Sequence, residues 1–242
     1  MSRIVSREED LSDCRRAFGE QAGEEFYHLK NSFIETLHLW QAYRSLFGLR
    51  RERVALLNDG SGSIARIMDR AMFDSVVLSL CRLRDPAASG PRGRLANLTL
   101  ERLGRSLEPP SADWPQLLSE VERCGERLVA LRNKSLAHAD LDVAIGAVPM
   151  SGVSRATVEA MIDAIKACLD HVHLTRLNIS VDWTLPWVEE GAAGLLQRLY
   201  LGIAEHDRLH DTGRLVAEHK AGRPDSEPTF PDWLNPAGPP RA

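Results

Sequence analysis

Polar side chains gather between residues 128 and 140, where the sequence reads Leu-Val-Ala-Leu-Arg-Asn-Lys-Ser-Leu-Ala-His-Ala-Asp. A cation, an amide, a hydroxyl and an imidazole follow a long apolar stripe there: Arg132, Asn133, Lys134, Ser135 and His138. A guanidinium can donate two parallel hydrogen bonds to a phosphate, and an imidazole titrates near neutral pH. These residue types at the end of a core-facing helix favour a phosphate site.

The spacing of Arg132 and His138 is weak support by itself. Because the chain has 30 basic residues, most of them arginine, and 8 histidines, chance places a His four to six residues after an Arg about two or three times. Arg214 and His219 form a second such pair, in polar surroundings. In an α-helix, Arg132 and His138 would be about 120° apart around the axis and roughly 9 Å apart along it. We therefore expect another helix to share the site.

A structural explanation of the same residues stays open. His138 could be a core histidine with a satisfied hydrogen bond, and Arg132 could form a salt bridge with Asp85 or Glu122. Two other histidines, His171 and His173, are two residues apart in an expected helix and therefore point to different faces. We expect both of them at the surface rather than in a metal site.

The rest of the chain predicts helices that position this stretch. Ala, Leu, Arg and Glu are abundant and favour helix, and apolar residues recur every three or four positions. Few segments show the alternation typical of strands. The expected fold class is all-α, an up-and-down helical bundle of about four long helices with a C-terminal helical extension. The four long helices are expected at about 20–47, 63–84, 109–140 and 154–177.

Glycine and proline mark the connections between these helices. Asp59-Gly-Ser-Gly should separate a short helix at 51–58 from the helix at 63–84, which starts at a serine cap. Apolar residues at helical spacing are expected to face the core along this second helix, among them Ile64, Ile67 and Ala71. A loop rich in Gly, Pro and Arg at 87–96 leads to a short helix after Asn97 or Thr99.

Four regions follow from these patterns: a charged N-terminal segment (1–19), the helical bundle (20–180), a linker with a C-terminal helix (181–221), and a tail rich in Pro and polar residues (222–242) that we expect to be disordered. The linker should be extended. Its Trp183 and Trp187 are expected to lie against the bundle, with a partner surface as the alternative.

Composition narrows the classes of function. The net charge of −4 does not favour general nucleic-acid binding, so any such contact must be local. The 4 cysteines lack metal-ligand spacing and suit a reducing compartment. We see no targeting segment and no apolar run near the roughly 20 residues of a membrane helix. The sequence thus predicts a cytoplasmic protein without a membrane partner, metal or cofactor.

The stretch Arg-Asn-Lys-Ser-Leu-Ala-His-Ala-Asp resembles the signature of the HEPN superfamily, helical-bundle proteins of prokaryotic defence and toxin–antitoxin systems. That signature is an Arg, usually followed by Asn or another polar residue, and then a His after four to six positions. Arg132, Asn133 and His138 match it. Tyr43-Arg-Ser-Leu-Phe-Gly48 and Arg82-Leu-Arg-Asp-Pro86 also end their helices as in the HEPN branch of abortive phage infection. The resemblance covers about residues 20–180.

The resemblance implies a metal-independent endoribonuclease, a homodimer in which two signatures face each other across one composite site. His138 would be the general base and Arg132 would stabilise the phosphate. Asn133, Lys134 and Ser135 would position the RNA, and Arg82, Asp85 and Asp140 are candidates for a supporting role. Phage defence or a toxin–antitoxin pair with a cognate antitoxin protein would be the setting. The alternative is a non-catalytic module of the same fold that binds RNA, a nucleotide or a protein.

Overall fold

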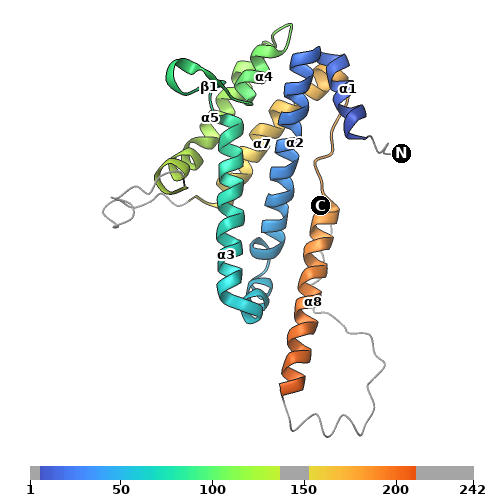
Figure 1. The fold of residues 1–242 in the computed structure, drawn as a ribbon, viewed down its shortest axis with the longest axis vertical. Coiled ribbons are helices and arrows are strands. Elements are labelled where there is room, and N and C mark those ends of the chain that lie inside the picture. Colours follow the sequence, from blue (N-terminus) through green and yellow to red (C-terminus); the bar gives the residue numbers. More distant parts are fainter. Residues whose placement is uncertain (1–5, 137–152, 211–242) are drawn as a thin grey trace. The chain divides into compact units, whose positions relative to one another are not determined.

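The computed structural model describes residues 6–136 and 153–210 (Figure 1). Within these ranges the chain is helical apart from connections and one two-stranded hairpin, so the all-α prediction is confirmed. The α-helices are α1 (Arg7–Phe18), α2 (Glu20–Tyr43), α3 (Arg51–Arg84), α4 (Leu100–Ser106), α5 (Trp114–Leu131), α7 (Arg155–Val172) and α8 (Pro186–His210). No helix in the described part is long and apolar enough to cross a membrane.

Three helix starts are capped by a side chain. The side chains of Ser6, Thr99 and Ser154 each accept a hydrogen bond from the backbone N–H three residues further on. Such caps satisfy one of the unpaired N–H groups of the first turn. The ends are less regular, because five-residue π-helical segments follow three of the helices: η1 (Arg44–Gly48), η3 (Arg132–Leu136) and η4 (His173–Leu177).

The chain forms two compact units: residues 1–37 with 74–183, and residues 38–73 with 184–242. In the first unit, α5 packs against α7. Its core contains fully buried apolar side chains from α2, α3, α4, α5 and α7, among them Phe26, Phe33, Leu80, Leu103, Leu128 and Ile165. The apolar stripes that predicted the bundle therefore supply its core.

A buried carboxylate joins α2 to α4 in the first unit. Oε1 of Glu25 accepts hydrogen bonds from Nε of Arg102 (2.7 Å) and Nε2 of Gln21 (3.1 Å), and Oε2 accepts one from Oγ of Ser106 (2.5 Å). Burial alone would raise the pKa of Glu25, but these hydrogen bonds outweigh burial and lower it. Both oxygens of this side chain are thus occupied by protein groups.

The second unit is built around a buried arginine. Nη1 of Arg53, in the first turn of α3, donates to the backbone oxygen of Ser45 in η1 at 2.7 Å. This bond satisfies a carbonyl at a helix end, where orphan acceptors are otherwise exposed. The same segment packs against α8, and Tyr43 stacks on Trp40 with ring centroids 5.4 Å apart. Aromatic groups at the end of α2 and a buried cation at the start of α3 thus organise this unit.

The predicted break at 59–62 is only partly present. A single helix assignment, α3, runs through it, and Ser61 alone leaves helical geometry (φ −173°, ψ 97°), which marks a kink. The expected core face beyond the kink is wrong at its start, because Ile64 and Ile67 are 53% and 60% exposed and Ala71 is exposed. The helical spacing was correct, but no described element covers these positions.

The linker before α8 contains no helix or strand at residues 178–185. Trp183 lies edge-on against Phe33 and His173, and its indole Nε1 donates to Oδ1 of Asp170 at 2.8 Å. Trp183 therefore lies against the bundle, whereas Trp187 is exposed. The expected surface position of His173 is wrong: it is only 3% exposed. Burial lowers its pKa, although the hydrogen bond from its ring to the oxygen of Leu169 opposes this.

Candidate functional site

Two helix ends meet at the predicted phosphate site. Arg132 begins η3 directly after α5, and Asp85 follows the last residue of α3. Nη1 of Arg132 lies 2.6 Å from Oδ1 of Asp85, so the two side chains form an ion pair with a hydrogen bond. The side chains are 20% and 30% exposed. Of the two carboxylates that the sequence suggested for Arg132, the structure selects Asp85.

The guanidinium of Arg132 uses only some of its N–H donors in hydrogen bonds to described residues. Its Nε donates to Oδ1 of the neighbouring Asn133 at 3.1 Å, and its Nη1 is directed to Asp85. Guanidinium has five N–H donors, and among the described residues no partner is present for Nη2 of Arg132. A carboxylate on one side and an amide on the other fix the orientation of the planar group. Donors remain for an anion.

The π-helical turn changes the expected geometry of the signature. The angle of about 120° between Arg132 and His138 assumed an α-helix throughout, but residues 132–136 form a π-helix. A π-helical turn holds more residues than an α-helical one, and such turns are frequent at functional sites. Because η1 and η4 end other helices in the same way, the turn alone does not identify a site.

The side chain of Arg84 on α3 lies against Gly125 on α5, and the sequence interpretation missed this contact. A Cβ added at Gly125 of α5 would lie 2.6 Å from Cδ of Arg84, so only a glycine lets the arginine stem lie across the helix at this place. Nη2 of Arg84 donates to the backbone oxygen of Glu122 at 3.4 Å. The signal was a lone glycine within a helical pattern, which often marks close packing.

Cys81 lies under the ion pair without contributing a nucleophile. Burial raises the pKa of its thiol to about 11, although the charges of Arg132 and Arg84 oppose this. The thiolate, which is the reactive form, is therefore scarce at neutral pH. Cys81 therefore acts as a small buried core residue of α3.

The structure does not bring every predicted site residue to the ion pair. Arg82 and Lys134 are exposed, and no described contact joins their side chains to Arg132. The side chain of Ser135 and the whole of His138 and Asp140 lie outside the described residues. Their roles therefore stay predictions. Within the two described ranges, no group of three or more His, Cys, Asp and Glu side chains is arranged to hold a metal.

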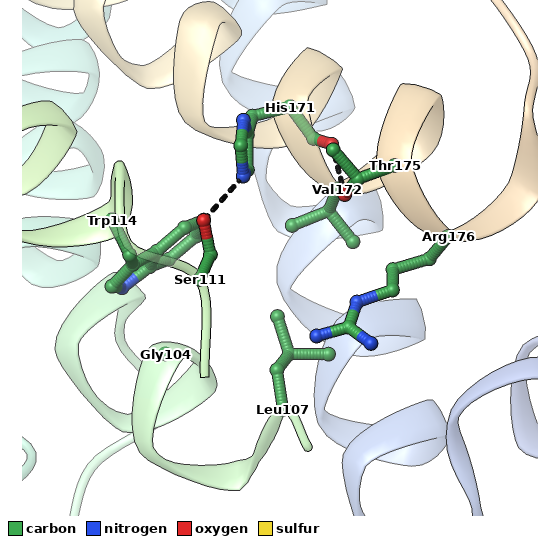
Figure 2. A pocket seen from close by; sticks show the side chains of 8 residues that line it. All are labelled: Gly104, Leu107, Ser111, Trp114, His171, Val172, Thr175 and Arg176. Carbon is green, nitrogen blue, oxygen red and sulfur yellow. Dashed lines mark hydrogen bonds between the residues drawn. The ribbon is translucent and has the colours of Figure 1, made fainter. Parts of the chain in front are cut away.

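A small cavity between the end of α4 and α7 is an alternative site (Figure 2). Nε2 of His171 lies 2.7 Å from Oγ of Ser111, a pair that could in principle activate a hydroxyl. The cavity volume is about 10 Å³, which is room for a single water. Among the described residues, no carboxylate pairs with His171 to orient it. This cavity is a packing defect rather than a substrate site.

The described part of the chain is thus a helical bundle in which the pair Arg132–Asn133 follows α5, and Arg132 pairs with Asp85 at the end of α3. A model of the HEPN_AbiU2 family, described as AbiU2, matches residues 19–186. This match covers most of the chain, and the chain belongs to this Abi-type HEPN family. The resemblance found in the sequence is thereby confirmed. No curated protein and no solved structure matches the chain.

Proposed function

We propose that this protein is an endoribonuclease that cleaves RNA without a metal. The observation that carries the proposal is the ion pair between Arg132 and Asp85, which holds the signature arginine at the end of α5 with donors to spare. Membership of the HEPN_AbiU2 family supports it. An arginine held in this way is preorganised for a phosphate, and preorganised donors are the main source of electrostatic catalysis.

The proposed reaction uses the 2′-hydroxyl of the RNA itself. His138 accepts the proton of this hydroxyl, and the oxygen attacks the adjacent phosphorus to form a 2′,3′-cyclic phosphate. The bond to the 5′-oxygen of the next nucleotide breaks, and this oxygen takes up a proton from water and leaves as a hydroxyl. Arg132 donates hydrogen bonds to the phosphoryl oxygens, on which negative charge grows in the transition state. Asn133 orients Arg132 through the bond to Nε. The requirement for a 2′-hydroxyl restricts the reaction to RNA.

The proposed site is shared by two copies of the chain. Each copy contributes one Arg132 and one His138, so that one substrate phosphate lies between two signatures. This arrangement would provide the second helix that the sequence led us to expect. The setting that we propose is phage defence or a toxin–antitoxin system, with a cognate antitoxin protein as an inhibitor.

RNA cleavage by the purified protein in EDTA tests the catalytic proposal. We expect the wild type to cut RNA and to leave DNA of the same sequence intact. His138→Ala and Arg132→Ala should each reduce the rate about 100-fold or more. A wild type that does not cut, or two variants that cut as fast as the wild type, would sink the proposal.

Mixing the two variants tests the composite site, because a mixed dimer retains one Arg132 and one His138.

One observation favours a second function, a non-catalytic module that binds RNA, a nucleotide or a protein. Asp85 neutralises much of the charge of Arg132, at 2.6 Å, and this weakens the attraction for a phosphate in the transition state. Such a module would bind its ligand without turnover. Binding of RNA by the wild type with no cleavage over hours would decide for this function.

A further inference from the structure

We infer that the hairpin between α3 and α4 is a basic arm that binds the phosphate backbone of RNA next to the proposed site. This inference rests on the proposed function, because it assigns a substrate contact to the same site. The arm consists of β1 (Ala88–Ser89), a turn at Pro91–Gly93 and β2 (Leu95–Ala96). Its first strand begins three residues after Asp85.

The base of the arm is fixed to the bundle. The backbone N–H of Asn97 donates to the oxygen of Ala87 at 2.9 Å, and Nδ2 of Asn97 donates to the oxygen of Pro86 at 2.8 Å. The backbone N–H of Ala87 donates to Oε2 of Glu101 on α4 at 2.8 Å. The strands pair in antiparallel register, Ala88 with Ala96 and Ser89 with Leu95. These hydrogen bonds therefore fix the orientation of the base of the arm.

The outer part of the arm is exposed and is shaped by glycine. Gly90 and Gly93 have φ angles of +75° and +65°, a region that other residues rarely adopt. Both strands are exposed, and Leu95 is 61% exposed. With about 3.3 Å per residue, the four residues between Pro86 and the turn reach at most roughly 13 Å beyond the root. This length suits contact with nucleotides that flank a bound phosphate.

The sequence of the arm carries positive charge and no negative charge. Residues 86–100 contain Arg92 and Arg94 and no acidic residue. The two acidic residues that flank this segment are engaged, Asp85 with Arg132 and Glu101 with Arg105. Arg94 donates from Nε to the oxygen of Pro91 at 3.3 Å, and it pairs with no carboxylate among the described residues. An exposed cation without a carboxylate partner is available to a phosphate.

The surroundings of the proposed site add to this charge. Segments 82–96 and 132–136 together contain six basic residues, Arg82, Arg84, Arg92, Arg94, Arg132 and Lys134, and only one acidic residue, Asp85. The whole chain has a net charge of −4. The positive charge is thus local, as the composition required for any contact with nucleic acid. The arm has no aromatic residue for stacking on bases, so it should bind RNA without sequence preference.

Salt dependence of RNA binding tests the arm separately from catalysis. The probe is a 2′-O-methyl oligoribonucleotide, which the proposed reaction cannot cleave. For single strands, each lost phosphate contact reduces the slope of log K against log salt by about 0.7. We expect Arg92→Ala/Arg94→Ala to reduce the slope by about 1.4 and to weaken binding. The matched control, Arg7→Ala/Arg16→Ala, removes two exposed charges from α1 and should leave the slope unchanged. Melting temperatures confirm that each variant is folded.

The conservative variant separates charge from structure. Arg92→Lys/Arg94→Lys keeps both cations and should keep the wild-type slope. If the arginines only shaped the turn, the lysine variant would lose the slope as the alanine variant does. An unchanged slope in the alanine variant overturns the inference even if the wild type cleaves RNA. A reduced slope in a protein that never cleaves RNA supports the arm and sinks the nuclease. Loss of binding to phosphatidylserine vesicles with unchanged RNA binding would assign the arm to a membrane and overturn the inference.

Discussion

Two arginine–carboxylate pairs in the first unit use the same chemistry in different surroundings. At the pair of Glu25 and Arg102, both carboxylate oxygens accept hydrogen bonds from protein side chains, and the side chain of Glu25 is only 10% exposed. At the pair of Arg132 and Asp85, the side chains are 20% and 30% exposed, and only one oxygen of Asp85 faces the arginine. Both carboxylate oxygens of the first pair accept hydrogen bonds, whereas only one oxygen of the second pair accepts one from a described residue.

This difference separates a structural pair from a candidate binding pair. A buried charge is tolerated only if its hydrogen bonds are complete, and Glu25 meets this condition through three partners. An arginine near water can keep unused donors at little cost, because water satisfies them until an anion arrives. Distance alone would not distinguish the pairs, which measure 2.7 and 2.6 Å.

The largest expected effect comes from removing the arginine of each pair. Arg132→Ala should slow RNA cleavage about 100-fold to 1000-fold and change the free energy of unfolding by about 1 kcal/mol or less. Arg102→Ala should leave the cleavage rate of the folded protein unchanged. Single-turnover rates and urea unfolding measure both quantities for each variant. Equal activity losses in the two variants would remove the distinction between the pairs.

The next effect concerns stability and should have the reverse order. Glu25→Ala leaves Arg102 and Ser106 without their acceptor and should lower the free energy of unfolding by about 2–3 kcal/mol. Asp85→Ala leaves Arg132 near water and should lower it by about 1 kcal/mol or less. Urea denaturation at pH 7 gives both values. A larger loss at Asp85 than at Glu25 would mean that the second pair is the structural one.

A smaller effect is expected when only the charge of Asp85 is removed. Asp85→Asn keeps an acceptor for Nη1 of Arg132 but replaces a charge-assisted hydrogen bond by a neutral one of roughly half the strength. We expect cleavage to slow about fivefold to tenfold, because Arg132 is held less firmly. Glu120→Gln, in the exposed pair of Glu120 and Arg123 on α5, is the matched control and should change nothing. A faster Asp85→Asn variant would show that Asp85 restrains Arg132 rather than positions it.

The sequence predicted the positions of the helices better than the contacts between them. Periodicity located the long helices, because apolar stripes at steps of three and four record which face is buried. It could not show the π-helical turn at Arg132, since its hydrogen bonds depend on how the helix end packs. It offered Asp85 and Glu122 equally as partners of Arg132. The choice required the crossing of α3 and α5 at Gly125.

Other errors have the same origin in tertiary contacts. His173 looked like a surface residue because it follows His171 by two positions. The linker, however, returns Trp183 to cover His173 against Phe26. Ile64 and Ile67 continue an apolar pattern that no described element covers. The loop at 87–96 contains a short hairpin because Gly90 and Gly93 close its turn. Local composition identified the glycines but not their pairing.

The smallest expected effect is a pH dependence of the stability, which arises from the buried His173. Burial lowers the pKa of His173 from its usual value of 6.5, so the unfolded chain binds more protons than the folded chain just below pH 6.5. Stability from this group is therefore complete above pH 6.5 and is lost as the pH falls through the lowered pKa. Glu25, whose pKa is lowered from 4.5, titrates in a separate window at more acidic pH.

Melting temperatures between pH 5 and pH 7.5 measure this effect. We expect the melting temperature of the wild type to fall below pH 6.5, and His173→Asn to flatten this fall while lowering the melting temperature at pH 7.5, because the ring contacts with Phe26 and Trp183 are lost. His206→Asn, at an exposed position of α8, should keep the wild-type slope. If His173→Asn has the same slope as the wild type, the protonation of His173 is not linked to folding. The buried surroundings of His173 would then differ from those of the Arg132–Asp85 pair in packing but not in their response to pH.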